Sequence, residues 1–301
     1  MDSIDDLPNE TILSVFELSK NIKNFGTNNI FSNQEKERLS NIVYGLLFFE
    51  PSTRTCLSFE AAIHRLHGKV IKLHTESSSQ KKGESDFDTV KTMENYVDIL
   101  IIRHPEKQFI HQCKSFINKP IINAGDGAGK HPTQALLDLY TIRDHFDCFP
   151  KKIAFTGDIR HSRTIHSLVY LLEKFKKDIH YHFICDDNLT ASDEFKIFLD
   201  ENVTGRYHYE NDIHSVVKEI DVLYLTRIQK ERFENNTDIT YVKLTKNILS
   251  ESNDKLIVLH PLPRNDEIPE YLDNHKKCKY FEQARNGVFV RMALLYYIFI
   301  I

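Results

Sequence analysis

Three hydroxyl side chains and one arginine stand between a strand-like stretch and a helical stretch: Ser52, Thr53, Arg54 and Thr55. Residues 46–49 before them are apolar, and apolar residues recur at helical spacing over 59–66. The start of a helix presents backbone N–H groups and the positive end of the helix dipole, which favours an anion. Hydroxyls and a guanidinium add donors that fit phosphate oxygens. The pattern therefore predicts a phosphate site, although such a run by itself is more often a plain helix cap.

Other polar groups follow strand-like stretches in the same way. They are Arg103, the pair His131 and Gln134, Arg163, the pair Arg227 and Gln229, and the run from His260 to Arg264. In parallel α/β sheets, ligands bind beyond the carboxyl ends of the strands. The pattern therefore predicts one cleft for a ligand with several negative charges. Taken singly, Arg163 and Arg227 are more often explained as structural ion-pair residues.

Strand-like and helical patterns alternate along the whole chain. The predicted strands cover residues 46–49, 70–73, 98–103, 120–123, 153–156, 181–185, 222–226 and 255–259. The predicted helices cover residues 9–23, 59–66, 90–97, 136–140, 165–172 and 213–220, and polar stretches at 24–33 and 75–86 predict loops. This alternation predicts an α/β fold of two domains, each a parallel β-sheet flanked by helices. We expect the domains at residues 1–132 and 133–285, with a C-terminal helix at 286–301 that packs back on the first domain.

The bulk properties exclude several classes of function. A net charge of −4, with lysines spread along the chain, argues against nucleic-acid binding. The five cysteines are odd in number and widely spaced, which indicates free thiols in a reducing compartment and therefore the cytoplasm. No histidine or cysteine spacing predicts a metal site. The N-terminus is unlike a signal peptide, and the apolar run at 293–301 is too short to span a bilayer, so we expect no membrane segment.

Nine motifs, in order over nearly the full length, resemble those of the aspartate carbamoyltransferases, within the aspartate/ornithine carbamoyltransferase family. They are Phe-Glu-Pro-Ser-Thr-Arg-Thr at 49–55, Lys-Lys-Gly-Glu at 81–84, Arg-His-Pro at 103–105, Asn-Ala-Gly-Asp-Gly at 123–127, His-Pro-Thr-Gln at 131–134, Gly-Asp at 157–158, Arg-Thr-Ile-His-Ser at 163–167, Thr-Arg-Ile-Gln-Lys-Glu-Arg at 226–232 and His-Pro-Leu-Pro-Arg at 260–264. The resemblance implies transfer of the carbamoyl group of carbamoyl phosphate to the amine of L-aspartate, an early step of pyrimidine biosynthesis. It also implies that family's fold, a homotrimer with shared active sites, and catalysis without a metal or cofactor. A regulatory chain or a larger assembly stays open.

The resemblance also implies a set of ligands for carbamoyl phosphate. The matching residues are Ser52, Thr53, Arg54, Thr55, Ser78, Lys82, Arg103, His131, Gln134, Pro261 and Leu262. By that match the run at 52–55 holds the phosphate, and Arg103 bridges the phosphate and the carbonyl oxygen. Gln134 and the backbone carbonyls at 261 and 262 hold the carbamoyl NH₂ group. Ser78 and Lys82 reach in from the neighbouring subunit.

Catalytic roles and aspartate ligands follow from the same match. The catalytic set is Arg54, Thr55, Lys82, Arg103, His131 and Gln134. Donors of this kind stabilise the oxyanion of a tetrahedral intermediate, and losing one typically costs about 10²–10³ in rate. The aspartate ligands are Arg163, Arg227, Gln229 and Lys82. No nucleophile is needed, because the amine of aspartate attacks directly.

Two rival functions remain open at this point. Ornithine carbamoyltransferases share the first half of the pattern, but their His-Cys-Leu-Pro segment is His260-Pro261-Leu262-Pro263 here. The second rival is a carbamoyltransferase-like scaffold without activity. One departure from the family is Cys56, where an arginine is usual. Since a helix N-terminus can lower the pKa of a thiol, we expect thiol reagents to modify Cys56 and inhibit the protein.

Overall fold

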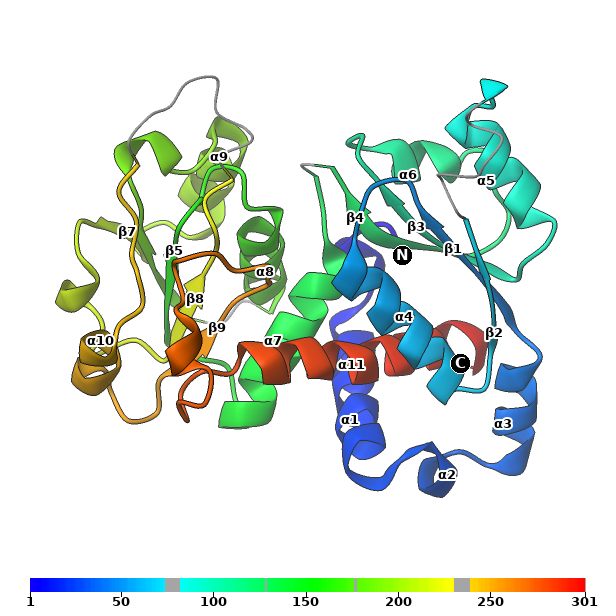
Figure 1. The fold of residues 1–301 in the computed structure, drawn as a ribbon, viewed down its shortest axis with the longest axis horizontal. Coiled ribbons are helices and arrows are strands. Elements are labelled where there is room, and N and C mark those ends of the chain that lie inside the picture. Colours follow the sequence, from blue (N-terminus) through cyan, green and yellow to red (C-terminus); the bar gives the residue numbers. More distant parts are fainter. Residues whose placement is uncertain (74–81, 128, 176–177, 230–238, 301) are drawn as a thin grey trace. The chain divides into compact units, whose positions relative to one another are not determined.

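The computed structural model describes residues 1–73, 82–127, 129–175, 178–229 and 239–300 (Figure 1). The chain forms two compact units. Unit 1 consists of Met1–Leu137 together with Arg285–Ile301, and unit 2 consists of Asp138–Ala284. Both boundaries fall inside helices, α7 (Pro132–Phe146) and α11 (Tyr280–Ile300). No helix in the described part of the chain is long and apolar enough to cross a membrane.

Unit 1 is built on a four-stranded parallel sheet of order β2-β1-β3-β4. Its strands are β1 (Val43–Phe48), β2 (Lys69–Lys72), β3 (Ile99–His104) and β4 (Ile121–Asp126). Its other elements, besides parts of α7 and α11, are η1 (Ile4–Asp6), α1 (Asn9–Phe25), α2 (Thr27–Ile30), α3 (Asn33–Ser40), α4 (Thr53–Arg65), α5 (Asp86–Glu94) and α6 (Phe109–Cys113).

Helices cover both faces of the unit 1 sheet. Leu47 and Ile102 pack with Val90 of α5 and Phe109 of α6 in one buried cluster. Successive strand residues point to opposite faces, so Tyr44 and Leu46 face the other way. On that side the buried ring of Tyr44 meets Phe299 of α11 edge to face, with ring centroids 5.9 Å apart. Figure 1 shows α5 and α6 on one side of this sheet and α4 on the other.

Unit 2 is built on a five-stranded parallel sheet of order β7-β6-β5-β8-β9. Its strands are β5 (Lys152–Thr156), β6 (His180–Ile184), β7 (Tyr207–Glu210), β8 (Val222–Leu225) and β9 (Ile257–Leu259). Its other elements are α8 (Arg163–Lys174), η4 (Asp187–Leu189), α9 (Asp193–Asn202), η5 (Ile213–Ser215), α10 (Lys246–Glu251) and η7 (Glu270–Leu272). The chain leaves β5 toward β6 on one side and reaches β8 on the other, so the strand order reverses between β5 and β8.

The predicted fold class is confirmed, with two parallel sheets flanked by helices. Two local predictions were wrong. The helix expected at 213–220 is only the short turn η5, and the loop expected at 24–33 contains α2. The apolar residues of the first segment are buried nevertheless, Val217 and Ile220 among them. Burial in irregular turns therefore gives the same spacing as a buried helix face.

Candidate active site

The predicted phosphate site lies at the start of α4, where the described structure shows no side-chain cap. Ser52 is the N-cap residue, and within the described structure its side chain makes no capping hydrogen bond. The first intrahelical bond comes from the Cys56 N–H to the Ser52 carbonyl, 3.2 Å away. Thr53 and Arg54 are exposed beside this end, whereas Thr55 is buried. The predicted phosphate cradle therefore lies at a helix end whose positive charge is not neutralised by a cap.

The charge of the first helical turn separates two groups of helices. Helices α4, α7 and α8 lie wholly within the described residues and have no acidic side chain in their first turns. By contrast, other helices have acids in their first turns, among them Glu35 in α3, Asp86 and Asp88 in α5, and Asp193 and Glu194 in α9. The short helices α2, α6 and α10 also lack an acid in the first turn. Helices α4, α7 and α8 begin directly after Ser52, His131 and Ser162, beside predicted anion ligands. Their dipoles favour anions.

Arg103 pairs with a carboxylate next to the predicted phosphate cradle. Its Nε lies 2.7 Å from Oε1 of Glu50, and both side chains are mostly buried. Arg103 pairs with Phe48 in the sheet register, and its carbonyl accepts the Phe49 N–H at 2.9 Å. The carboxyl ends of β1 and β3 therefore place Glu50 and Arg103 together, and the terminal nitrogens of the guanidinium are oriented by that pair.

His131 and Gln134 stand at the start of α7, after β4. His131 is buried, its carbonyl accepts the Gln134 N–H at 3.1 Å, and the Gln134 side chain is half-buried. The turn before His131 is held by Asp126, whose carboxylate accepts the backbone N–H groups of Lys130 and Gln108. This turn fixes where α7 begins and therefore where His131 lies.

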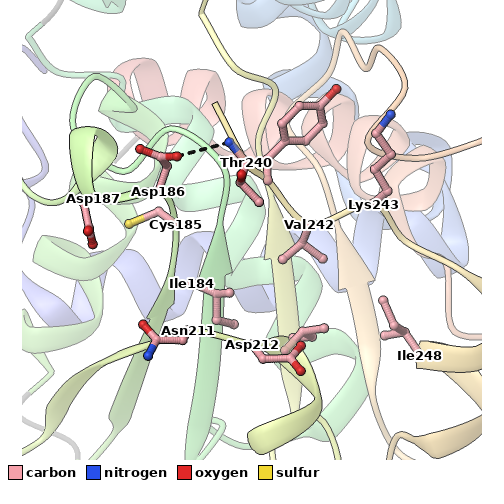
Figure 2. A pocket seen from close by; sticks show the side chains of 12 residues that line it. Ile184, Cys185, Asp186, Asp187, Asn211, Asp212, Thr240, Val242, Lys243 and Ile248 are labelled. Atoms are coloured by element: carbon pink, nitrogen blue, oxygen red, sulfur yellow. Dashed lines mark hydrogen bonds between the residues drawn. The ribbon is translucent and has the colours of Figure 1, made fainter. Parts of the chain in front are cut away.

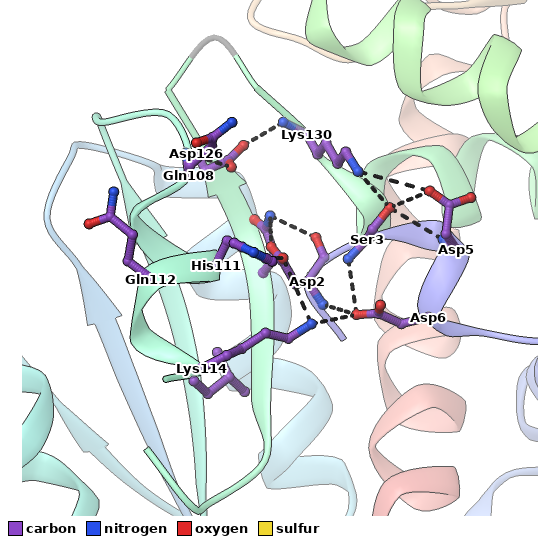
Figure 3. A network of polar contacts seen from close by, with 12 residues as sticks. Asp2, Ser3, Asp5, Asp6, Gln108, His111, Gln112, Lys114, Asp126 and Lys130 are labelled. Atoms are coloured by element: carbon purple, nitrogen blue, oxygen red, sulfur yellow. Dashed lines mark hydrogen bonds and ion pairs between the residues drawn. The ribbon is translucent and has the colours of Figure 1, made fainter. Parts of the chain in front are cut away.

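Residues near the N-terminus brace the same turn. The Lys130 ammonium donates to the Ser3 hydroxyl at 3.0 Å, and the Asn123 amide donates to the Asp2 carbonyl at 3.0 Å. The Asn123 N–H also donates to the Met1 carbonyl at 2.9 Å, so residues 1 and 2 lie along the outer edge of β4. Figure 3 shows this network.

The remaining predicted ligands of unit 1 come from the segment after β2. Ser78 lies outside the described residues. Lys82 is exposed at the end of that segment, ahead of α5.

In unit 2, Arg163 and Arg227 flank the reversal of strand order. Arg163 begins α8 after β5, and Arg227 and Gln229 follow β8; all three side chains are half-buried. The two strand ends approach closely at Gly157, whose φ is +104° and where a Cβ atom would lie 2.1 Å from the Thr226 carbonyl oxygen. Only glycine fits this approach. Sheets of this kind bind ligands at such a reversal.

The loop after β9 carries the last two predicted ligands. Pro261 and Leu262 are half-buried, and Leu262 has a φ of +56°, unusual for a residue other than glycine. The predicted cluster at 260–264 also contained Arg264, but this residue has a structural role. Its guanidinium donates to Asp273 at 2.8 Å and to the Tyr280 hydroxyl at 3.0 Å, which holds the pKa of Asp273 below its usual value.

A pocket of about 410 Å³ lies elsewhere in unit 2, at the carboxyl ends of β6 and β7 (Figure 2). Its lining includes the apolar Ile184 and Ile248 and the carboxylates of Asp186, Asp187 and Asp212. No predicted site residue lines it. Three carboxylates repel phosphate and dicarboxylates, so this pocket does not suit the predicted substrates.

Burial changes the expectation for Cys56. The thiol is partly enclosed, and this desolvation raises its pKa; Lys72 lowers the pKa and Glu60 raises it, both by less. The expectation that the helix N-terminus lowers the pKa of Cys56 is therefore wrong, because the pKa is raised. A thiol with a raised pKa is a slow nucleophile.

Comparison with known proteins agrees with this geometry. The family model for the aspartate/ornithine carbamoyltransferase carbamoyl-P binding domain matches residues 1–144, and the model for the Asp/Orn binding domain matches residues 150–298. The aspartate carbamoyltransferase catalytic subunit of Thermoplasma volcanium is 43% identical, with 98% of this chain and 96% of that protein covered. The catalytic subunit of Picrophilus torridus is 40% identical, with coverage of 97% and 95%.

Solved structures give the same result. Trypanosoma cruzi aspartate transcarbamoylase in complex with carbamoyl aspartate and phosphate has a TM-score of 0.88 at 34% identity, covering 98% of this chain and 94% of that one. The catalytic subunit of M. jannaschii aspartate transcarbamoylase has a TM-score of 0.86 at 36% identity, with coverage of 98% and 96%. The fold and site define a two-unit parallel α/β protein with arginine, histidine and hydroxyl side chains gathered at strand ends. The chain belongs to the aspartate/ornithine carbamoyltransferase family, as its motifs predicted.

Proposed function

We propose that the chain is an aspartate carbamoyltransferase, which transfers the carbamoyl group of carbamoyl phosphate to the amine of L-aspartate and forms N-carbamoyl-L-aspartate and phosphate. The observation that carries this proposal is the placement of the predicted ligands. Those at 52–55, 131 and 163 lie at helix starts without acidic residues. The ligands at 227, 229, 261 and 262 follow the ends of β8 and β9, and Arg103 lies near the end of β3. The T. cruzi relative binds carbamoyl phosphate and aspartate in its crystals, which supports the same substrates here.

Carbamoyl phosphate is assigned to unit 1 and the loop after β9. The phosphate accepts hydrogen bonds from the first turn of α4 and from the residues at 52–55. Arg103, held by Glu50, donates to both the phosphate and the carbonyl oxygen. Thr55, Arg103 and His131 polarise the carbonyl, and Gln134 with the carbonyls of the loop after β9 binds the NH₂ group. These fixed donors stabilise the oxyanion that forms when the amine attacks.

Aspartate is assigned to unit 2. Arg163 and Arg227 bind its two carboxylates and Gln229 donates a further hydrogen bond, which places the amine for attack on the carbonyl carbon. Guanidinium groups suit a dicarboxylate, whereas the ammonium of ornithine would be repelled. The amine loses a proton as the C–N bond forms, and phosphate leaves with the electron pair of the C–O bond and accepts that proton. Catalysis rests on positioning and fixed charge.

Further parts of the proposal concern the assembly. The protein forms a homotrimer in which Ser78 and Lys82 complete the site of the neighbouring subunit. It works in the cytoplasm, which the five free cysteines support. Some relatives are called catalytic subunits and others, such as the multifunctional protein CAD of Squalus acanthias, are much longer than this chain. Either a regulatory chain or a larger assembly is compatible with the sequence.

Two experiments test the proposal. Purified protein with carbamoyl phosphate should form carbamoyl-aspartate from aspartate and no citrulline from ornithine; turnover with ornithine alone identifies the sister activity. Calorimetric binding of carbamoyl phosphate without turnover identifies a scaffold. Mixing inactive Arg54→Ala and Lys82→Ala proteins should restore part of the activity if sites are shared between subunits. No recovery, with both variants folded and trimeric, contradicts the shared site.

A further inference from the structure

His260 is buried directly beneath the loop that carries Pro261 and Leu262. Its side chain is only 1% exposed. The ring nitrogen Nδ1 accepts the Leu262 N–H at 2.8 Å, and Nε2 lies 2.9 Å from Oε1 of Glu267. The His260 N–H donates to the Gln283 side chain at 2.9 Å. Backbone and both ring nitrogens of His260 are therefore engaged.

These contacts fix the tautomer of the ring. A backbone N–H can only donate, so Nδ1 of His260 carries no proton, and the proton is on Nε2, facing Glu267. Glu267 is 3% exposed and also accepts the Asn265 N–H at 2.9 Å. Burial raises the pKa of Glu267, but the hydrogen bonds from His260 and Asn265 outweigh it, so the net shift is downward. The carboxylate therefore keeps Nδ1 available as an acceptor.

The loop above this ring is held in an uncommon conformation. Leu262 has φ +56°, where a branched side chain clashes with its own backbone. Such a conformation persists only when the surroundings impose it. The bond from the Leu262 N–H to His260 orients the peptide group between Pro261 and Leu262 and so determines which way the Pro261 carbonyl faces. The Leu262 carbonyl follows from that peptide group through the φ of Leu262.

We propose that His260, oriented by Glu267, is a positioning residue that aims the Pro261 and Leu262 carbonyls at the NH₂ group of the substrate, and so makes the site select a carbamoyl phosphate over an acyl phosphate. The inference rests on the proposed function, in which those carbonyls accept hydrogen bonds from NH₂. Acetyl phosphate has a methyl group in place of NH₂ and nearly the same shape. Its methyl group cannot donate a hydrogen bond, so the carbonyl groups of Pro261 and Leu262 lose their partners when acetyl phosphate binds.

The test compares dissociation constants for carbamoyl phosphate, acetyl phosphate and inorganic phosphate, measured by calorimetry on the full chain. The unmodified protein should bind carbamoyl phosphate at least about tenfold more tightly than acetyl phosphate. Asn offers an acceptor near the position of Nδ1, whereas Gln reaches the position of Nε2. His260→Asn should therefore keep the preference within about threefold, and His260→Gln should lose most of it. Affinity for inorganic phosphate should stay unchanged in both.

Controls separate a positioning role from a structural one. His214→Gln changes a similar pair on the surface of unit 2, where Nδ1 lies 2.6 Å from Glu251, and should leave the ratio unchanged. Partial unfolding lowers the number of sites but not the ratio of two dissociation constants. Glu267→Met provides a second route if His260→Gln does not fold, and it should also reduce the ratio.

Three results would overturn the inference. They are an unchanged ratio in His260→Gln or in Glu267→Met, equal losses in His260→Gln and His260→Asn, or a parallel loss of phosphate affinity. Failure of the proposed function looks different. In that case the unmodified protein binds no carbamoyl phosphate, or binds it without forming carbamoyl-aspartate from aspartate.

Discussion

Asp138 is a fully buried carboxylate whose replacement should destabilise unit 2 strongly. Its Oδ2 accepts the Tyr224 hydroxyl at 2.8 Å, and its Oδ1 accepts the Gln283 amide at 2.6 Å. Asp138→Leu leaves both buried donors without this acceptor. Each such loss costs about 1–3 kcal/mol, so we expect about 2–6 kcal/mol in total. That is a large share of the 5–15 kcal/mol that usually holds a domain folded.

A double-mutant cycle shows whether this loss comes from orphaned donors. Tyr224→Phe removes one donor, so the Asp138→Leu/Tyr224→Phe protein should be about 1–2 kcal/mol more stable than the sum of the single effects predicts. The chain contains no tryptophan, so urea unfolding is followed by far-ultraviolet circular dichroism. Gln283→Leu is the matched change on the other donor to Asp138. Additive effects, or a loss below about 1 kcal/mol in Asp138→Leu, would refute the reasoning.

Three further predictions concern activity, acid stability and thiol chemistry. Arg103→Lys keeps the positive charge but loses the planar guanidinium fork, so kcat should fall about 10²–10³-fold. The control Arg65→Lys, on the exposed end of α4, should leave kcat unchanged. Equal kcat values for Arg103→Lys and the unmodified protein in steady-state assays would contradict the assignment. Burial lowers the pKa of His166 from 6.5 to about 4. Between these pH values the folded protein therefore binds fewer protons than the unfolded chain. The free energy of unfolding should fall by up to about 3 kcal/mol as the pH drops through this window. Urea midpoints at pH 7 and pH 5 should differ less in His166→Gln. Exposed Cys148 should react with a thiol reagent before Cys56, whose pKa is raised, and Cys148→Ser should abolish the fast phase; a fast phase that survives refutes this.

The sheets and the strand-end positions of the ligands could be predicted because both are local. An apolar stretch, a polar turn and a helical pattern lie next to one another at 46–66, so the sequence alone places Arg54 at a helix start. Parallel topology then puts such starts at one edge of a sheet. The same local reasoning recognised the loop after β9 but not the structural role of Arg264.

Contacts between distant residues could not be predicted. Glu50 and Arg103 are far apart in the chain and meet only because β1 and β3 are neighbours. His260 and Glu267 lie in irregular backbone, where no periodicity relates their side chains. The pKa of Cys56 depends on how deeply the thiol is buried, and the position of Cys56 in its helix does not reveal that burial. Each of these properties requires the packed structure.

The residues at the beginning of the chain also affect how the protein behaves at high concentration. Met1 and Asp2 occupy hydrogen-bonding groups along the outer edge of β4. An uncovered strand edge is a template for pairing with another chain and a common origin of aggregation. Removal of these residues would leave Asn123 and its neighbours open to such pairing, so a shortened chain should precipitate even where its catalysis is intact.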